Sequence, residues 1–389
     1  MMRTVLLTTE RTEISIWREE DRALAECLWG DPAVTHYISA DGVFTLQQIH
    51  ERLQTEINNQ IRYGVQYWPV FHKESGELIG VCGLRPYGEN AYELGFHLRP
   101  CFHHQGYAFE TASAVIAYAF DTLHAHRLSA GHHPANTASK KVLKKLGFCF
   151  TGKEYYAPTG LFHPSYELRN DGIHYSDDTS GFVLVSELIP EAVYDIRYAS
   201  ENNFMGVPVH GYEEPCAILT IQACKALKEA YDELKEQGYG IRIYDGYRSQ
   251  KAVDHFMAWA ADPSDIKMKE HYYPGIDKNQ IIPQGFIAEH SGHTRGSTVD
   301  LTLIDLHTGE DLDMGGHFDF FNEISHYDSI QITEAQKKNR EILHTVMMKH
   351  GFMPLAEEWW HFTLADEPYP DTYFTFPVSR TIMKNRRIT

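Results

Sequence analysis

The sequence predicts an α+β fold in two domains. Short strand and helix patterns alternate over residues 1–170, which indicates a mixed sheet with helices. The chain has 389 residues, more than the ~150 that one domain commonly uses. Residues 171–182 are rich in Gly, Ser and Asp, which is the composition of a linker. A second α+β domain is therefore expected at residues 183–389.

Apolar runs predict the elements of the first domain. Strands are expected at residues 12–17, 68–71, 78–84 and 92–98, where apolar side chains alternate or follow one another. Residues 46–62 repeat apolar side chains at helical spacing and predict an amphipathic helix. The order of these patterns favours a mixed sheet.

Two further helices of the first domain have clear starts. After the last strand a turn at Gln105-Gly106 leads into a helix with one apolar face, formed by Ala112, Val115, Ile116, Ala119 and Phe120. The free backbone N–H groups of such a start bind phosphate well, although an ordinary strand-to-helix turn has the same pattern. A second helix begins at Asn136 as its cap and stops at Gly147.

These two segments, after the strand with Glu93-x-Gly95-Phe96, resemble the GNAT superfamily of acetyl-CoA-dependent N-acetyltransferases. Within it, the ribosomal-protein N-terminal acetyltransferases are the most similar, over about residues 8–170. The resemblance implies that Asn136 hydrogen-bonds the pantetheine arm of acetyl-CoA. It also implies that the pyrophosphate lies against the backbone of Gln105, Gly106, Tyr107 and Ala108.

The second domain opens with a helical pattern. Residues 217–237 repeat apolar side chains at a mostly helical period, which predicts a helix covering one face of a sheet. Gly238-Tyr-Gly240 ends it, and residues 241–244 alternate as a strand that leads to Arg248. An Arg just past a strand end is commonly a surface residue.

Two stretches of the second domain together predict a zinc site. They are Ser291-Gly-His293-Thr-Arg-Gly296-Ser-Thr-Val-Asp300 and Glu357-Glu358-Trp-Trp-His361. A catalytic zinc takes three nitrogen or oxygen ligands, leaves one position open and needs a carboxylate base nearby. His293, Asp300 and His361 supply the ligands, and Glu358 supplies the base. Each piece alone is also compatible with a capped turn, a polar strand residue or a core histidine.

The spacings constrain the local backbone. His293 and Asp300 are seven residues apart and would face opposite sides of one continuous strand, so a strand, a turn at Gly296 and a second strand are expected. In that second strand Val299, Leu301 and Leu303 face one side and Asp300 and Thr302 the other. Glu358 and His361 are three apart, which suits one helical turn, although the two tryptophans between them suit a strand equally.

At these residues the chain resembles D-alanyl-D-alanine dipeptidases of the vancomycin-resistance type. Ser-x-His-x-x-Gly-x-x-x-Asp followed by Glu-x-Trp-His is their signature. The likeness covers roughly residues 183–380 and includes the segments 194–204, 244–248 and 312–319. One departure is Thr298, where the family usually has Ala.

The resemblance implies a function and several roles. The substrate is D-Ala-D-Ala, with a place in cell-wall precursor turnover or recycling, and Arg248 stabilises the negative charge that develops on the peptide carbonyl. Asp319 receives the free ammonium of the substrate, and Ser291 either binds its carboxylate or supports one of the metal ligands from behind. Glu358 acts as general base and then as acid.

The net charge indicates which classes of partner are unsuitable, and the cysteines indicate the compartment. The net charge of -18 and the pI near 5.7 argue against nucleic acid and anionic membranes. The six cysteines form no Cys-x-x-Cys pair, so reduced thiols in a cytoplasm are the simplest account. No apolar run has the length of a signal peptide or a membrane span. The expected partners are small molecules: D-Ala-D-Ala and an amine acceptor.

Three alternatives stay open. A zinc D,D- or L,D-carboxypeptidase would share the ligands but act on longer peptidoglycan stem peptides. The first domain could bind coenzyme A without catalysis, because His103 stands where the GNAT superfamily often has Arg or Gln. A pure scaffold has no use for three ligands and a base, and is least favoured.

Overall fold

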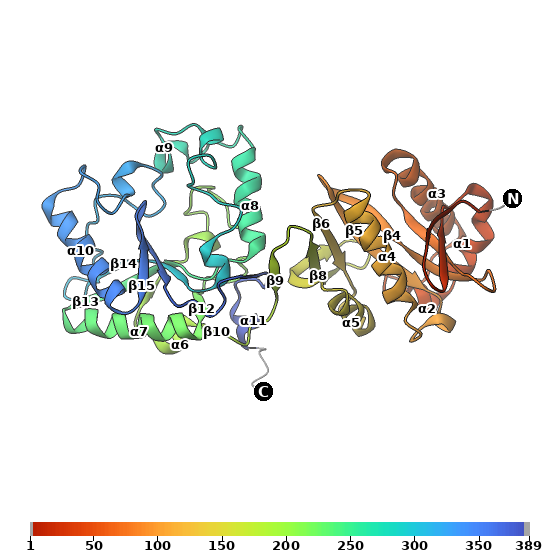
Figure 1. Ribbon diagram of the computed structural model, residues 1–389, viewed down its shortest axis with the longest axis horizontal. Helices are drawn as coiled ribbons and strands as arrows, with labels where there is room; N and C mark the ends of the chain where they lie inside the picture. Colours follow the sequence, from red (N-terminus) through yellow and green to blue (C-terminus); the bar gives the residue numbers. More distant parts are fainter. Residues whose placement is uncertain (1–2, 385–389) are drawn as a thin grey trace. The chain divides into compact units, whose positions relative to one another are not determined.

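The computed structural model describes residues 3–384, and the chain divides into two compact units. The first unit runs up to Ile173 and the second begins at His174. Each unit contains its own sheet with helices packed on it (Figure 1). The predicted α+β fold in two domains is confirmed.

The N-terminal unit is built on one eight-stranded sheet with the order β1-β2-β3-β4-β5-β6-β8-β7. All neighbouring strands are antiparallel except β5 and β6. The strands are β1 (Val5–Thr8), β2 (Thr12–Ser15), β3 (Tyr67–His72), β4 (Leu78–Gly88), β5 (Ala91–Leu98), β6 (Arg127–Gly131), β7 (Cys149–Tyr156) and β8 (Leu161–Arg169). Four of the eight were predicted, with ends that differ by a few residues.

Helices connect these strands. The predicted amphipathic helix is α3 (Leu46–Tyr63), which Thr45 caps by accepting a hydrogen bond from the backbone of Gln48. The two predicted helices after the last strand are α4 (Tyr107–Asp121) and α5 (Thr137–Lys145). The remaining helical segments are η1 (Glu19–Asp21), α1 (Arg22–Trp29), α2 (Pro32–Thr35) and η2 (Pro100–Phe102).

The parallel strands β5 and β6 pair over a short distance and then diverge. A parallel connection needs a crossover, and α4 supplies it. The two strands pair only from Ala91–Glu93 against Arg127–Ser129, and beyond those residues they part. Ligands of sheets with parallel strands bind in the crevice outside the carboxyl ends of such strands.

The C-terminal unit has a five-stranded sheet with the order β11-β13-β14-β16-β15, in which only β11 and β13 are parallel. Its strands are β11 (Val193–Tyr194), β13 (Tyr239–Asp245), β14 (Thr298–Asp305), β15 (Phe352–Leu355) and β16 (Glu358–Leu364). Two smaller sheets pair β10 (Phe182–Leu184) with β12 (Ile218–Thr220) and β9 (His174–Ser176) with β17 (Thr372–Phe374).

Helices α7 (Ile221–Glu236) and α10 (Glu334–Lys349) pack on each other and on this sheet (Figure 1). The prediction of a helix at 217–237 was wrong at its start, because residues 218–220 form β12 and Thr220 then caps α7. The remaining helical segments are α6 (Val185–Leu188), η3 (Arg197–Ala199), α8 (Gln250–Ala261), α9 (Lys269–Tyr272), η4 (Lys278–Gln280), η5 (Gly292–Arg295), η6 (Glu323–Ser325) and α11 (Arg380–Lys384).

The stretch predicted as a linker contains structure. Its residues 174–176 are β9, which pairs in parallel with β17 near the other end of the C-terminal unit. Residues Asp171 and Gly172 before it are exposed and belong to no helix or strand. The predicted bounds 1–170, 171–182 and 183–389 therefore stay a proposal.

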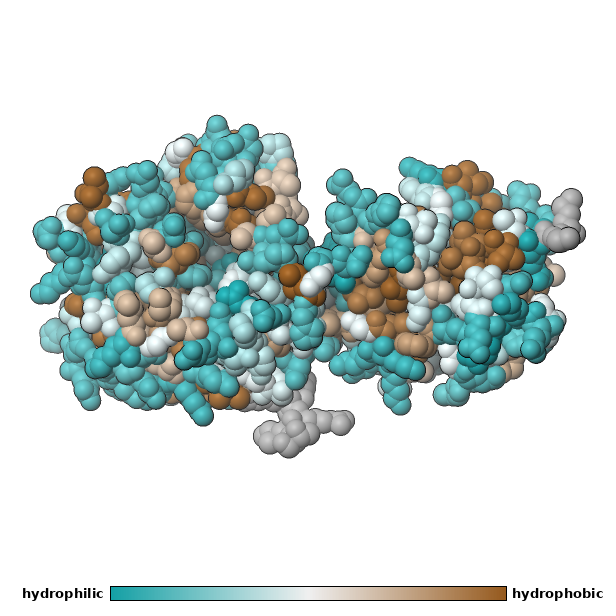
Figure 2. Space-filling model, viewed as in Figure 1, coloured by the Kyte–Doolittle hydropathy of each residue, from teal (hydrophilic) through white to brown (hydrophobic). Residues whose placement is uncertain are grey.

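An aromatic cluster anchors the start of the C-terminal unit. The fully buried ring of Phe182 packs edge-on against Phe374, Phe376 and Tyr247. Gly296 lies against the same ring: an added Cβ would come within 2.1 Å of it, and φ is +83°. Only glycine fits both the space and the backbone there. In the view of Figure 2, hydrophilic residues cover most of the surface of the C-terminal unit.

Candidate functional site

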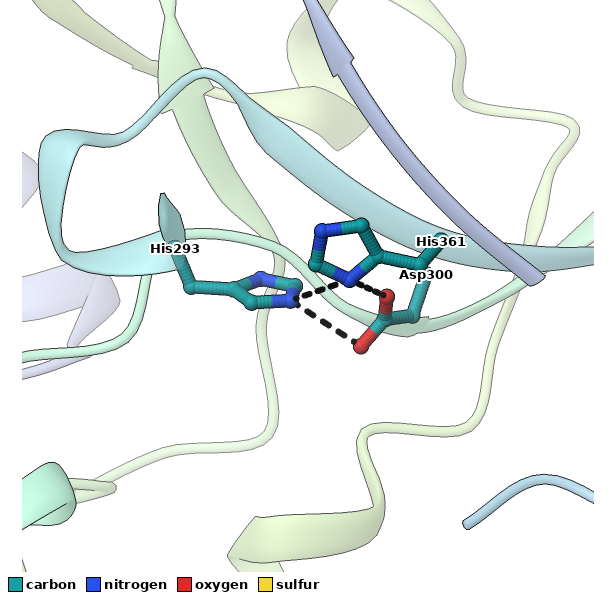
Figure 3. A group of neighbouring side chains, drawn as sticks. All are labelled: His293, Asp300 and His361. Carbon is teal, nitrogen blue, oxygen red and sulfur yellow. Dashed lines mark hydrogen bonds and ion pairs between the residues drawn. The ribbon is translucent and has the colours of Figure 1, made fainter. Parts of the chain in front are cut away.

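The structure brings His293, Asp300 and His361 together in the C-terminal unit (Figure 3). Nε2 of His293 lies 3.2 Å from Oδ2 of Asp300 and 3.3 Å from Nδ1 of His361. Nδ1 of His361 lies 3.1 Å from Oδ1 of Asp300. Nitrogen and oxygen atoms from three segments of the chain thus converge on one place.

This geometry fits a zinc ion. Ligand atoms of a tetrahedral zinc lie roughly 3.3 Å apart, because the bonds to zinc are about 2.0–2.1 Å long. Each of the three side chains offers one nitrogen or oxygen atom, and these atoms lie within 4.8 Å of one another. The contacts of 3.1, 3.2 and 3.3 Å, in which a different oxygen of Asp300 faces each histidine, are close to that spacing. In addition, Oδ1 of Asp300 is buried, and its contact with Nδ1 of His361, at 3.1 Å, does not have good hydrogen-bond geometry. A buried carboxylate needs a positive group beside it.

The sheet sets the spacing of two members of this group. Asp300 on β14 and His361 on β16 are direct partners across the antiparallel pair. Directly opposite residues have Cβ atoms about 4.5–5.5 Å apart, so their side chains meet. Asp300 also alternates with Val299 and Leu301, as predicted, so the carboxylate lies on the side of β14 away from those apolar residues.

His293 reaches the group differently from the prediction. Residues Gly292–Arg295 form the short 3-10 helix η5 and not a strand, and Gly296 ends it in the left-handed conformation. The expected turn at Gly296 is confirmed, but the strand before it was wrong. The hydroxyl of Ser291 accepts a hydrogen bond from the backbone N–H of His293 and so caps η5.

Glu358 and His361 lie on β16, so of the two local structures that the sequence left open the strand is the one that forms. In a regular strand, residues three apart point to opposite sides. The β15–β16 pairing is irregular here: Pro354 is opposite Phe362, but Leu355 is opposite Glu358. The extra residues on β16 form a bulge that returns Glu358 to the side of His361, where Oε2 lies 3.4 Å from Nδ1.

A backbone carbonyl orients His293. Nδ1 of its ring donates to the carbonyl oxygen of Gly246, at 2.7 Å. This hydrogen bond fixes the tautomer and leaves the lone pair of Nε2 facing Asp300 and His361. His293 is 2 % exposed, so water does not compete for this contact.

Arg248 follows β13 and lies beside the group. Its Nε and one terminal nitrogen donate to Oδ2 of Asp245, at 3.0 and 2.8 Å, and the same terminal nitrogen is 3.9 Å from Oδ2 of Asp300. Burial acts to lower the pKa of Arg248, but Tyr198 and Asp245 outweigh it and the pKa is raised. The guanidinium is thus a fixed positive charge at the site.

Asp319 is buried near the same place. Its Oδ2 accepts a hydrogen bond from the hydroxyl of Tyr198, at 2.9 Å. Burial raises the pKa of Asp319, and the negative charges of Asp300 and Glu358 raise it further. A carboxylate held against this repulsion suits a cationic partner.

The charges of the group are strongly coupled. Burial acts to raise the pKa of Asp300, but His293 and then His361 outweigh it and the pKa is lowered. Burial acts to lower the pKa of His361, but the hydrogen bonds to Asp300 and Glu358 outweigh it and raise the pKa to about 10. The negative charge of these carboxylates therefore attracts a cation into the group.

The residues predicted to bind acetyl-CoA lie around the start of two helices in the N-terminal unit. Gly106 precedes α4 with φ of +87°, and the side-chain amide of Gln105 donates to the carbonyl of Cys101. Asn136 caps α5, because its side-chain oxygen accepts from the backbone of Ser139. Among the described residues no hydrogen bond from its amide nitrogen is found.

A cavity of about 320 Å³ lies where β5 and β6 part. Asn136 lines it together with residues that the sequence analysis gave no role, among them Arg52, Arg85, Glu93 and His97. Burial raises the pKa of Glu93 and lowers the pKa of His97. A carboxylate with a raised pKa in a cavity suits a general base.

Comparison with known proteins supports the division of the chain. Residues 178–379, more than half of the chain, match the family model of D-ala-D-ala dipeptidases. The chain belongs to this dipeptidase family. Two relatives are a D-alanyl-D-alanine dipeptidase of Enterococcus faecalis, 46% identical over 200 residues, and one of Streptomyces coelicolor, 43% identical over 201 residues. The matches cover 51% and 52% of this chain and 99% and 100% of the two relatives.

The N-terminal unit has relatives of its own. Residues 11–149 match the model of the acetyltransferase (GNAT) domain. An uncharacterized N-acetyltransferase of Bacillus subtilis, YnaD, is 31% identical over 142 residues, which cover 36% of this chain and 81% of that protein. A GNAT-family acetyltransferase structure from Bacillus anthracis is 25% identical, with a TM-score of 0.37, and covers 42% of this chain and 97% of that one. The protein is a dipeptidase-family peptidase fused to a GNAT acetyltransferase domain.

Thr298, where the dipeptidase family usually has Ala, forms a hydrogen bond that alanine could not form. The hydroxyl of Thr298 lies 2.8 Å from that of Thr363, its partner across β14 and β16, and the two share a hydrogen bond. The pair satisfies both hydroxyls on β14 and β16, beside Asp300.

Among residues 3–384, every helix is too short or too polar to span a membrane.

Several candidate residues could not be found from the sequence. Arg52 lies in an ordinary amphipathic helix, and its side chain resembles any solvated charge of that helix. The one available signal was Glu93, the carboxylate in a strand whose other residues are mostly apolar or small.

Proposed function

We propose that the C-terminal unit hydrolyses D-Ala-D-Ala with a zinc ion held by His293, Asp300 and His361. The observation that carries this is that one nitrogen or oxygen atom from each of the three side chains lies within 4.8 Å of the other two. The zinc ion supplies Lewis-acid chemistry when bound. The relatives of Enterococcus faecalis and Streptomyces coelicolor are D-alanyl-D-alanine dipeptidases, which supports this substrate.

The side chains around His293, Asp300 and His361 transfer the proton, stabilise the developing charge and bind the substrate. Glu358 takes the proton of the attacking water and returns it to the departing amine. Arg248 donates hydrogen bonds to the carbonyl oxygen as negative charge develops on it. Asp319 accepts the free ammonium of the dipeptide, and Ser291 binds its carboxylate or supports His293 through η5.

Zinc content and turnover of ligand variants test the proposal. The purified chain should carry about one zinc ion, and His293→Ala, Asp300→Ala or His361→Ala should lose it together with the hydrolysis of D-Ala-D-Ala. The control is His307→Ala, which removes an exposed histidine of the same unit. Full zinc occupancy in all three ligand variants would refute the site. Faster cleavage of longer stem peptides would favour a carboxypeptidase instead.

We propose that the N-terminal unit transfers the acetyl group of acetyl-CoA to an amine. The backbone at Gln105, Gly106, Tyr107 and Ala108 would hold the pyrophosphate, and Asn136 the pantetheine arm. Glu93 would take the proton of the acceptor amine. The left-handed Gly106 before the 15-residue helix α4 supports this, because it leaves the backbone at the helix start open to a ligand.

The proposed setting is the cytoplasm, in cell-wall precursor turnover or recycling. All six cysteines lie in the described part of the chain and none forms a disulfide, which suits a reducing compartment. The partners proposed are small molecules, D-Ala-D-Ala and an amine acceptor, since the net charge of -18 disfavours nucleic acid and anionic membranes.

A further inference from the structure

The cavity of the N-terminal unit offers room for a small acceptor. Its volume of about 320 Å³ lies at the low end of the range of ligand sites, roughly 300–1,000 Å³. The lining comes from the diverging strands β5 and β6, from β7 and β8, and from helix α3. The charges that face this space therefore decide which amine fits.

One of the two cavity arginines has its charge matched. Arg85 pairs with Glu56, whose side chain is fully buried, and its guanidinium lies 4.2 Å from the ring centre of Tyr67. The other carboxylate oxygen of Glu56 accepts from the backbone N–H of Tyr67, at 2.8 Å. Both carboxylate oxygens of Glu56 are thus engaged, one by Arg85 and one by the backbone of Tyr67, and its charge acts on Arg52 without a direct ion pair.

The second cavity arginine has no such partner. Among the described residues no ion pair to Arg52 is found, and its buried Nε has no hydrogen-bond partner. Its guanidinium lies 5.0 Å from the ring centre of Trp29 and 5.7 Å from that of Phe44. Burial and then the charge of Arg85 lower the pKa of Arg52. A guanidinium in this state favours an anion, and a carboxylate matches its planar fork of donors.

Glu93 provides the opposite charge in the same cavity. Burial raises the pKa of Glu93, and the charge of Arg85, the hydroxyl of Tyr67 and then the charge of Arg52 act against this rise. Within the part of the chain that the structure describes, Glu93 and Arg52 form no ion pair with each other. The cavity therefore holds a cation and an anion that stand apart, and a ligand with a carboxylate and an amine can satisfy both.

We propose that the acceptor is a small amino acid, its carboxylate bound by Arg52 and its amine by Glu93. This rests on the proposed acetyltransferase activity and adds the class of acceptor. The proposed dipeptidase activity of the same chain releases such amino acids. Acetylation then consumes the product of hydrolysis, and D-alanine is the acceptor to test.

The transfer balances without a further reactant. The ammonium of the amino acid loses one proton to Glu93, and the neutral nitrogen attacks the thioester carbonyl carbon. A carbon–nitrogen bond forms, and the carbon–sulfur bond breaks with its electron pair on sulfur. The nitrogen releases its second proton, sulfur takes up a proton, and the products are an N-acetyl amino acid and coenzyme A.

A carboxylate-deleted analogue tests this directly on the full chain. D-Alanine and D-alaninamide are each offered with acetyl-CoA, and thiol release and the acetylated product are measured. We expect kcat/KM to be about 10- to 100-fold higher for D-alanine, the range for hydrogen bonds to a charged group. Incubation with D-Ala-D-Ala and acetyl-CoA should give N-acetyl-D-alanine. Equal rates for alanine and its amide, or acetylation of the intact dipeptide alone, would overturn the proposal.

Variants of helix α3 locate the carboxylate site. Arg52→Gln should remove most of the preference for D-alanine over D-alaninamide, and Arg52→Lys should keep part of it because the charge remains. Arg62→Gln changes an exposed arginine of the same helix and should leave the preference intact. A preference that survives in Arg52→Gln would overturn the assignment of Arg52.

Binding of acetyl-CoA separates this proposal from the activity on which it rests. Calorimetry with acetyl-CoA on the full chain and on Arg52→Gln also reports whether the variant folds. If acetyl-CoA binds and D-alaninamide is acetylated while D-alanine is not, only the acceptor class is overturned. If acetyl-CoA does not bind the full chain, the acetyltransferase activity falls with it.

Discussion

Glu358 and Glu357 are adjacent carboxylates with different surroundings. Oε2 of Glu358 lies 3.4 Å from Nδ1 of His361, and the side chain is half-buried, whereas Glu357 is exposed. A general base must reach the attacking water in the site, and of these two carboxylates it is Glu358 that lies beside His361.

Glu358→Gln should therefore abolish most turnover while zinc stays bound. Glutamine is close to isosteric but accepts no proton at neutral pH, and the loss of a positioned base costs about 10²- to 10⁴-fold in rate. The measurement is zinc content alongside kcat on D-Ala-D-Ala. Glu357→Gln is the control and should change little. More than about a tenth of the rate remaining in Glu358→Gln would show that the base is another group.

His163 on β8 should make the N-terminal unit sensitive to acid. Its side chain is buried and lies 2.8 Å from the hydroxyl of Thr159. Burial, and then the charges of His133 and His132, lower the pKa of His163 to about 4. An unfolded histidine titrates near 6.5, so protons bind the unfolded state first and stability falls as the pH drops from about 6.5 towards 4.

Thermal unfolding across this pH window checks the prediction. The unfolding temperature of the unmodified protein should fall relative to His163→Gln between pH 7 and pH 4, because the variant lacks the titrating ring. His126→Gln, which removes an exposed histidine of the same unit, should follow the unmodified protein. A constant difference between the unmodified protein and His163→Gln would contradict the assignment.

At the scale of elements, sequence patterns predict those helices and strands whose apolar residues recur at a regular spacing. The strands β3, β4 and β5 and the helices α3, α4 and α5 follow from apolar spacing and caps. The short strand β12 was missed because its three apolar or small residues continue directly into the pattern of α7. The β16 bulge was missed because it depends on pairing with β15, and no local pattern encodes that register.

Helix α4 gives the prediction at this scale. Gly106→Ala should weaken acetyl-CoA binding, because φ is +87° and a side chain in that region costs roughly 1–2 kcal/mol or forces the backbone to shift. A shift would move the N–H groups at the start of α4. The measurement is calorimetry with acetyl-CoA on the full chain.

Gly160 provides the matched control for α4. It lies in the turn between β7 and β8, also has positive φ, at +69°, and has open space around it. Gly160→Ala should lower stability by a similar amount and leave acetyl-CoA affinity unchanged. Equal affinities in both variants would show that the α4 start does not hold the coenzyme.

At the scale of the whole molecule, the two units should separate as folded fragments. A protease site placed at Asp171-Gly172 cuts in the last residues of the first unit and before β9. We expect the N-terminal fragment to bind acetyl-CoA and the C-terminal fragment to bind zinc, each as in the full chain. Aggregation of either fragment after this cut would indicate a shared core.

The position of the cut matters because β9 pairs with β17. A site placed after Ser180 leaves β9 on the wrong fragment and should lower the unfolding temperature of the C-terminal one. The difference between the two cuts measures what the β9–β17 pair contributes. Composition alone could not reveal this pair, since His174 and Thr372 are far apart in the sequence.

The two candidate sites differ in how much of each could be predicted from the sequence. The ligand group of the C-terminal unit could be proposed because its residue types and spacings are unusual together. The cavity of the N-terminal unit could not, because Arg52 and Glu93 come from a helix and a strand that only the tertiary fold places around one space. Their unpaired charges become visible only with the surrounding partners in place.

The cross-strand pairing of Asp300 with His361 has a consequence for the order of events in assembly. Hydrogen bonds between β14 and β16 hold these residues opposite each other, so the entropic cost of bringing these two proposed ligands together is already met when the chain folds. Zinc fingers, by contrast, need their ion in order to fold. We expect a chelator to remove hydrolysis while the amide protons of β14 and β16 remain among the slowest to exchange with deuterated water.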